Sequence, residues 1–186
     1  MPARWALGML VVLLALPASG LDAAPAFAAD PPALLTSAGQ AADMQIVKLL
    51  MERLSIPMTV KALARPDDLR GAKTLVIAIG GSSTSLGAAG VGADQELARL
   101  EALLARAQEL GIKVLSVHIG GPARRGELSD RFIAAVVPKS GHVIVVTDGN
   151  ADGLFTRLTT QSRVTMETVD RLSDIEAALR RVFRVK

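Results

Sequence analysis

The sequence predicts an α/β fold, namely a three-layer, doubly wound and mostly parallel six-stranded sheet. Apolar runs suited to buried strands alternate along the chain with segments of helical periodicity. The connections are short and contain the glycines and prolines that end strands and helices. A flavodoxin-like strand order, 2-1-3-4-5 extended by a sixth strand, is the first expectation, and the Rossmann order 3-2-1-4-5-6 is the second.

Each element is predicted from its local pattern. The run 74–79 is rich in β-branched residues and apolar throughout, which is typical of a strand buried on both faces. Leucines at helical spacing make 94–110 an amphipathic helix that ends at Gly111. Ser129 is expected to cap the next helix. The expected strands are 33–37, 58–63, 74–79, 113–119, 142–146 and 164–169, and the expected helices are 43–54, 94–110, 129–137, 154–160 and 174–183.

The first 28 residues have the pattern of a signal peptide. Arg4 precedes an apolar run that is shorter than the ~20 residues of a membrane span. Ala26 and Ala28 occupy the two positions that signal peptidase reads, so cleavage is expected before Ala29. An uncleaved anchor is the alternative. After cleavage we expect a leader over 29–34, a single domain over 35–186, no stable membrane insertion and a periplasmic or secreted location.

Composition excludes some classes of partner. The chain has 186 residues, no cysteine and a net charge of +3, and its core must be aliphatic because aromatic residues make up only 3% of the chain. Its basic residues are spread out and are not interleaved with aromatics, so a nucleic-acid partner is not expected. Without cysteine, an exported domain must derive its stability from its core alone.

Polar, glycine-containing loops follow four of the expected strands. The four loops are 36–40, 80–92, 118–127 and 147–153, whereas the turns that lead from helices into strands are plainer. In a parallel sheet these loops share the carboxyl edge, where ligands bind near the switch in strand order. The expected ligand-binding residues are Ser37, Gln40, Gly80, Gly81, Ser82, Ser83, Ser85, Arg124, Arg125, Asp148 and Asn150.

The glycine-rich loop and the arginine pair each allow two interpretations. The segment 80–85 could offer backbone amides and hydroxyls to an anion, or it could be a tight turn whose serine caps a helix. It matches neither the P-loop nor the nucleophile elbow of hydrolases. Arg124 and Arg125 could contact an anionic ligand, or could pair internally with Glu127 or Asp130.

His118 is the candidate catalytic residue, because it ends an apolar strand beside Gly120, where a general base would be well placed. A half-buried structural histidine is the alternative. We expect no metal, because 148–152 lacks the glycine and glutamate of a calcium loop. We also expect no cofactor: the first turn, 37–42, lacks the dinucleotide fingerprint, and a flavin would favour the Trp or Tyr that the mature chain does not have.

Several motifs together resemble a family of small exported bacterial proteins catalogued only as a domain of unknown function. The resemblance covers about 35–183 and implies no activity. The segments that carry it are 36–40, 67–75, 80–83 with 86–90, and 118–121 with 124–130.

These observations predict an exported protein that binds a small polar or anionic molecule at the carboxyl edge of its sheet. One alternative is a hydrolase or transferase that uses His118 and a loop serine, Ser82 or Ser83. The other is an accessory or interaction protein without a ligand, and a homodimer is one form that it could take.

Overall fold

The computed structural model describes residues 27–186 and contains one sheet of six parallel strands. The strand order is β2-β1-β3-β4-β5-β6, so the flavodoxin-like prediction is confirmed and the Rossmann order is wrong. All of the expected signal peptide except Phe27 and Ala28 lies outside the described residues. The strands are β1 (Ala33–Ala38), β2 (Met58–Val60), β3 (Thr74–Ile79), β4 (Lys113–His118), β5 (His142–Val146) and β6 (Thr165–Val169).

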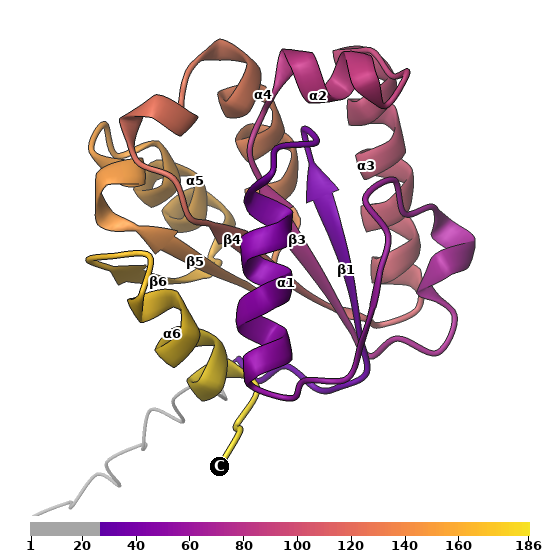
Figure 1. Ribbon diagram of the computed structural model, residues 1–186, viewed down its shortest axis with the longest axis vertical. Coiled ribbons are helices and arrows are strands. Elements are labelled where there is room, and N and C mark those ends of the chain that lie inside the picture. The colour runs from indigo at the N-terminus through magenta and orange to yellow at the C-terminus, as the bar shows by residue number, and fades with distance from the viewer. Residues whose placement is uncertain (1–26) are drawn as a thin grey trace, which may run out of the picture.

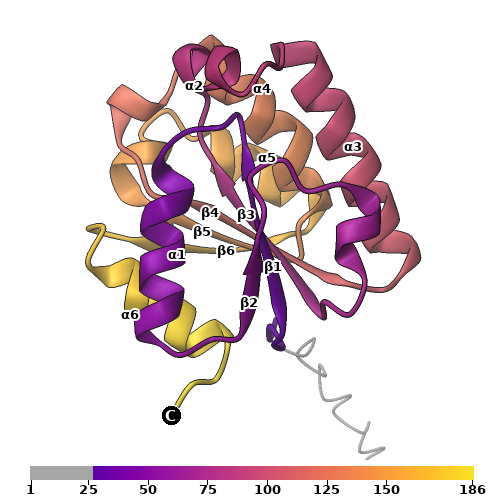
Figure 2. The ribbon, with the colours of Figure 1, turned by 45° about the vertical axis from the view of Figure 1, so that its right-hand side comes forward.

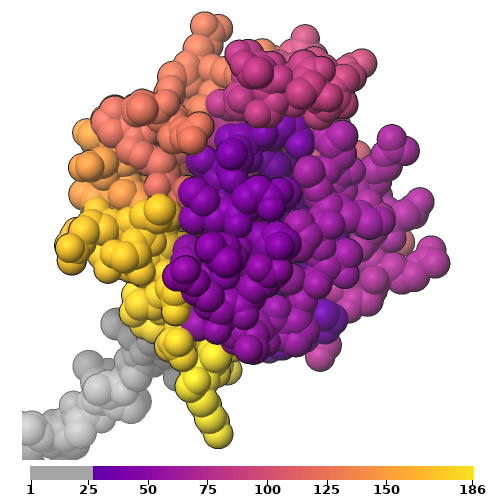
Figure 3. All heavy atoms as spheres, in the orientation of Figure 1, coloured from indigo at the N-terminus to yellow at the C-terminus, as the bar shows by residue number. Residues whose placement is uncertain are grey.

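Helices cover both faces of the sheet (Figures 1 and 2). Helices α1 and α6 pack on one face and lie side by side in the space-filling view (Figure 3), while α3, α4 and α5 pack on the other. In the part of the chain described, no helix is long and apolar enough to cross a membrane. The helices are α1 (Asp43–Arg53), α2 (Ser83–Ala88), α3 (Ala93–Glu109), α4 (Glu127–Val136), α5 (Leu154–Ser162) and α6 (Asp174–Val182), with short 3₁₀ turns η1 (Pro66–Leu69), η2 (Pro122–Arg124), η3 (Val137–Lys139) and η4 (Thr147–Asn150).

The central strands are apolar on both sides because each side faces helices. In β3, Val76 and Ala78 belong to the core under α1 and α6, whereas Leu75, Ile77 and Ile79 belong to the core under α3 and α4. This alternation follows from the two-residue repeat of a strand. The alternation fixes the register of β3 against both neighbours, because a one-residue slip would turn each of its side chains to the opposite face of the sheet.

The glycine-rich segment differs from its prediction, because 83–88 is a helix. Ser82 caps α2 through its hydroxyl, which accepts a hydrogen bond from the Ser85 amide. Leu86 is the buried residue of this helix, so the segment has too little apolar periodicity to be predicted from sequence. The helix-cap interpretation of Ser82 is therefore confirmed.

Other boundaries also differ. Ser129 does not cap α4, which begins at Glu127 after Gly126, a glycine with a φ of 118°. The edge strand β2 ends at Val60, and the Ala62 carbonyl accepts hydrogen bonds from side chains that follow β1 or lie within it. Strand β1 includes residues 33 and 34 of the expected leader, and both are buried.

Candidate functional site at the carboxyl edge of the sheet

The switch in strand order lies between β1 and β3. There, the loop after β1 and the loop after β3 are hydrogen-bonded to each other. The Gly80 amide donates to the Ala38 carbonyl, and the Ser82 amide donates to the Gly39 carbonyl, both at 2.9 Å. Gln40 and Gly81 form an antiparallel bridge across the same gap. The two loops expected to open a ligand crevice are therefore joined by backbone hydrogen bonds.

The backbone amides of the glycine-rich segment are largely committed inside the protein. The Gly81 amide donates to the Ser129 hydroxyl at 3.0 Å, and the Ser82 and Ser85 hydroxyls lie 2.9 Å apart and bond to each other. A Cβ atom on Gly81 would lie 2.9 Å from the Ser129 nitrogen, so a glycine is needed for this approach. Of the predicted cradle, only Ser83 is exposed, and it lies in the first turn of α2.

A buried ion pair that the sequence analysis missed stabilises the end of β1. Glu96 and Arg99 of α3 bond to each other, and Glu96 also accepts from the Gly39 amide and from the Gln40 side chain. Burial opposes ionisation of Glu96, but the hydrogen bonds and charge of Arg99 outweigh it and lower the pKa. Arg99 also donates to the Ser37 carbonyl at 2.6 Å. Gln40 is thus held by internal partners.

Arg125 is fully engaged with its own neighbours. It donates to Asp130 at 2.7 Å, forms a fork with both carboxylate oxygens of Asp152, and donates to the Gly149 carbonyl. Its guanidinium lies 5.7 Å from the centre of the Phe155 ring. The hydrogen bonds to Asp130 and Asp152 raise the pKa of Arg125, and the hydrogen bond from Arg125 lowers the pKa of Asp152 to about 2. The internal-pairing interpretation therefore holds for Arg125.

Arg124 differs from its neighbour because its guanidinium is largely free. Its side chain packs over Gly120, is 48% exposed and places Nε 3.5 Å from Asp43 Oδ1. Its terminal nitrogens form no ion pair or hydrogen bond with the described residues. Asp43 is the first residue of α1 and only 3% exposed, yet its Oδ2 has no hydrogen-bond partner among those residues. In the sequence, Asp43 is marked only as the expected start of a helix.

His118 is completely buried and has one unsatisfied nitrogen. Its Nδ1 lies 2.9 Å from the Ile79 carbonyl, which can only accept, so Nδ1 carries the proton. Its Nε2 is then an acceptor, and it has no partner among the described residues. Burial lowers the pKa of His118, while the bond to Ile79 and the charge of Asp43 oppose the shift. The ring packs against Phe155 and is neutral at pH 7.

The remaining predicted residues have separate positions. Ser37 is buried, and its hydroxyl has no partner among the described residues. The Asn150 side chain accepts from the amides of Phe155 and Thr156 and so stabilises the start of α5. Asp148 is exposed and borders a hollow of about 250 Å³ lined by Pro122, Arg125, Gly126, Asp130, Asp148, Ala151 and Asp152. No group of His, Asp and Glu in 27–186 could hold a metal ion.

Comparison with known proteins identifies the family. The family model described as Domain of unknown function (DUF6305) matches residues 30–183. The chain belongs to this family. The resemblance predicted from the sequence motifs is therefore confirmed at the level of the family, which has no assigned activity.

Other comparisons add little to the DUF6305 assignment. No curated protein matches. Among solved structures, a mutant of the esterase AlinE4 is similar with a TM-score of 0.32 and 10% sequence identity, over 81% of this chain and 80% of the esterase chain. A likeness at that level carries no argument about chemistry.

In this DUF6305 domain, the predicted residues thus fall into two groups. Gln40, Gly80, Gly81, Ser82, Ser85, Arg125 and Asn150 are engaged in internal hydrogen bonds. Ser37, Ser83, Arg124, Asp148 and His118 keep at least one polar group free of described partners. Asp43 joins the second group because its Oδ2 has no partner among the described residues, while its Oδ1 makes only the 3.5 Å contact with Arg124.

Proposed function

We propose that the carboxyl edge binds a small polar molecule that carries an anionic group, with Arg124 and Asp43 as its main contacts. The observation that carries this proposal is the buried Asp43 carboxylate, whose Oδ2 has no hydrogen-bond partner. A buried polar atom left unpaired costs about 1–3 kcal/mol, and more when it is charged. A ligand that donates a hydrogen bond to Oδ2 would offset this cost.

The free groups at this edge define the chemistry of the ligand. The terminal nitrogens of Arg124 suit a carboxylate or phosphate, which a guanidinium binds with two parallel hydrogen bonds. Asp43 Oδ2 and His118 Nε2 are acceptors, so they need a donor such as a hydroxyl or an ammonium group. Such a ligand therefore combines an anionic group with at least one donor.

Access to the acceptors depends on Arg124. Its side chain packs over Gly120 and is half exposed, with one long ion-pair contact of 3.5 Å. Such a contact contributes little, about 0–1 kcal/mol, so the side chain can rotate towards a ligand at low cost. Once the guanidinium has turned towards the solvent, the anionic group of the ligand would bind its terminal nitrogens and the donor group of the ligand would reach Asp43 Oδ2.

A thermal-shift series tests the combination of groups. Glycerol supplies only hydroxyls, inorganic phosphate supplies only the anion, and glycerol phosphate supplies both. We expect glycerol phosphate to give the largest rise in Tm, about 4 °C at roughly ten times its Kd. Native mass spectrometry should detect the same complex.

Two arginine variants make the test specific. Arg124→Ala should abolish the shift, whereas Arg106→Ala should keep it, because Arg106 is similarly exposed but pairs with Glu109 near the end of α3. No shift with any of the three compounds, or an unchanged shift in Arg124→Ala, would contradict the proposal.

A hydrolase or transferase is the second candidate, favoured by one observation. Neutral His118 has a free Nε2 acceptor and could take a proton as a general base. Against it, the Ser82 and Ser85 hydroxyls bond to each other, and no described serine hydroxyl bonds to His118. Ester or phosphoester turnover that His118→Asn abolishes while ligand binding persists would favour this candidate over a pure binder.

A further inference from the structure

The buried carboxylate of Asp43 depends on one cation for its charge compensation. Asp43 is 3% exposed, and its only ion pair with a described residue is the 3.5 Å contact between its Oδ1 and Arg124 Nε. Its Oδ2 faces the backbone of Gly80, where an added Cβ would lie 3.0 Å away. The Gly80 amide cannot serve Oδ2, because it already donates to the Ala38 carbonyl.

No other arginine of the neighbouring loop and helix can take the place of Arg124. Arg125 is matched by Asp130 at 2.7 Å and by Asp152 at 2.9 Å, and Arg131 is matched by Asp94. When Arg124 turns towards an anionic group, Asp43 therefore loses its described counterion. A buried charge without a counterion is strongly unfavourable, so the complex needs a new positive charge beside Asp43.

We propose that the ligand is a zwitterion whose primary ammonium replaces Arg124 as the partner of Asp43, while its anionic group binds the Arg124 guanidinium. This inference rests on the proposed function and names the chemical class of its ligand. A hydroxyl would donate one hydrogen bond to Oδ2 but would bring no charge. A primary ammonium brings both the charge and three donors, so it can serve both carboxylate oxygens.

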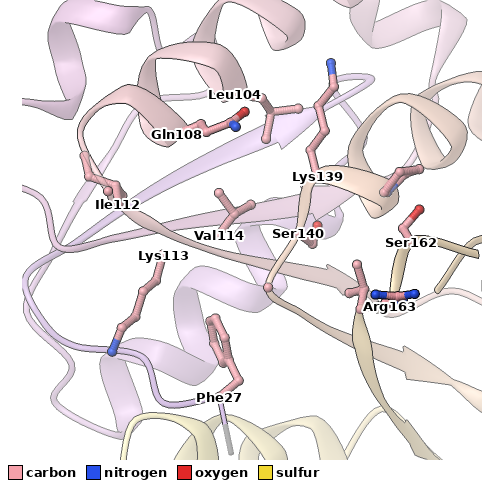
Figure 4. Close-up of a pocket in the computed structure, with 14 residues that line it drawn as sticks. Phe27, Leu104, Gln108, Ile112, Lys113, Val114, Lys139, Ser140, Ser162 and Arg163 are labelled. Atoms are coloured by element: carbon pink, nitrogen blue, oxygen red, sulfur yellow. The ribbon is translucent and has the colours of Figure 1, made fainter. Parts of the chain in front are cut away.

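The opposite edge of the sheet provides a comparison. The largest hollow among those described lies there, with a volume of about 620 Å³, beside the starts of β4 and β5 and the end of α5 (Figure 4). Lys113, Lys139 and Arg163 border it, and none of the described residues that line it is acidic. None of them has a buried polar side-chain atom without a partner. That hollow could attract an anion, but it offers no carboxylate to an ammonium group.

Isothermal titration calorimetry of the full 186-residue chain with a matched pair of compounds tests the ammonium group. Ethanolamine phosphate and ethylene glycol phosphate share their length and their anionic group, and differ only in an ammonium in place of a hydroxyl. We expect ethanolamine phosphate to bind about tenfold more tightly, because its ammonium adds a charge–charge attraction at a buried carboxylate. The net charge of +3 would favour the opposite order, since ethylene glycol phosphate is the more negative compound.

Four variants assign the preference to Asp43 and Arg124. In Asp43→Asn, both compounds should bind weakly and with equal Kd, whereas the exposed control Asp94→Asn should keep the tenfold difference. Arg124→Ala should weaken both compounds, because their shared anionic group loses its partner. Lys139→Ala removes an exposed cation from the hollow at the opposite edge and should change neither Kd. A tenfold preference that survives in Asp43→Asn would overturn the inference.

The same ammonium and phosphate groups occur in a lipid headgroup, so a further arm separates the two sources. The Asp43 carboxylate is buried, and a headgroup held in a bilayer cannot enter as far as a free molecule. We therefore expect no co-sedimentation of the protein with vesicles of phosphatidylcholine and phosphatidylethanolamine. Co-sedimentation that requires phosphatidylethanolamine and is lost in Asp43→Asn would overturn the assignment to a free zwitterion.

The outcomes for the unsubstituted chain separate this inference from the proposed function. If the two phosphates bind with equal Kd, or the hydroxyl compound binds more tightly, the ligand is not a zwitterion and the proposed anion site still stands. If neither compound binds and glycerol phosphate gives no thermal shift, the proposed function and this inference are both wrong.

Discussion

At the scale of single residues, the proposed binding role rests on Asp43 and Arg124, whose pairing with each other adds little to stability. Asp43 is buried at the start of α1, where the helix dipole favours a negative charge. Its only described ionic partner is the half-exposed Arg124 at 3.5 Å. Residues that remain unsatisfied in this way are often retained because they act on a ligand.

The first prediction concerns this carboxylate. Asp43→Asn keeps the shape of the side chain and removes its charge, so we expect the ligand-free protein to become more stable by about 1 kcal/mol. The same variant should lose the thermal shift produced by glycerol phosphate, because a neutral amide is a weaker acceptor. Urea unfolding and thermal shift measure the two effects.

The comparison for Asp43→Asn is Asp94→Asn. Asp94 is 91% exposed in its pair with Arg131, so removal of its charge should change stability by less than about 0.5 kcal/mol and leave binding unaffected. If Asp43→Asn instead destabilises the ligand-free fold by several kcal/mol, the carboxylate has a structural role and the proposed binding role is wrong.

At the scale of elements, Arg125 joins the loop after β4 to the loop after β5. Its guanidinium bonds to Asp130 in α4, to Asp152 before α5 and to the Gly149 carbonyl. A planar guanidinium with five donors can serve the four acceptor atoms of these partners at once, whereas a lysine ammonium has only three donors. We therefore predict that Arg125→Lys costs about 2 kcal/mol of unfolding free energy, measured in urea.

The control for Arg125→Lys is Arg131→Lys. Arg131 is 44% exposed and pairs with a single carboxylate, so this variant should cost less than about 0.5 kcal/mol. Equal effects of the two variants would show that the Arg125 network does not stabilise the connection between these loops.

The elements that sequence could predict are those whose signal is local. The strand 74–79 is continuously apolar and needs no other part of the chain to be recognised. The site is different, because its determinants are partners distant in sequence. The Gly81 amide donates to the Ser129 hydroxyl, and the Arg125 guanidinium pairs with the Asp152 carboxylate in another loop. Glu96 and Arg99 resemble an ordinary helical ion pair until β1 is placed beside them.

At the scale of the whole molecule, the buried His118 and the partly buried His142 connect stability to pH. Burial lowers the pKa of both His118 and His142 from the ordinary value of 6.5. The groups that face them are Asp43, Arg125 and Asp130 around His118, and Glu167 around His142. Carboxylates whose pKa is lowered, such as Glu96, contribute in a more acidic range, because their stabilisation is lost as the pH falls through the ordinary value of 4.5 and below it.

The last prediction follows from the direction of these shifts. Above pH 6.5 both histidines are neutral in the folded and unfolded chains, so their contribution is fully present. As the pH falls below 6.5, the unfolded chain takes up protons that the folded protein does not bind, and unfolding becomes easier. Each histidine can contribute a slope of at most about 1.4 kcal/mol per pH unit.

We expect urea unfolding to show stability decreasing between about pH 7 and pH 5. The double variant His118→Asn/His142→Asn should show a flat profile over that range, although its absolute stability changes. A slope that survives in the double variant would place the titrating groups elsewhere. Phe27→Ala should reduce the slope by itself, because the loss of the stacked ring exposes His142 and returns its pKa towards 6.5.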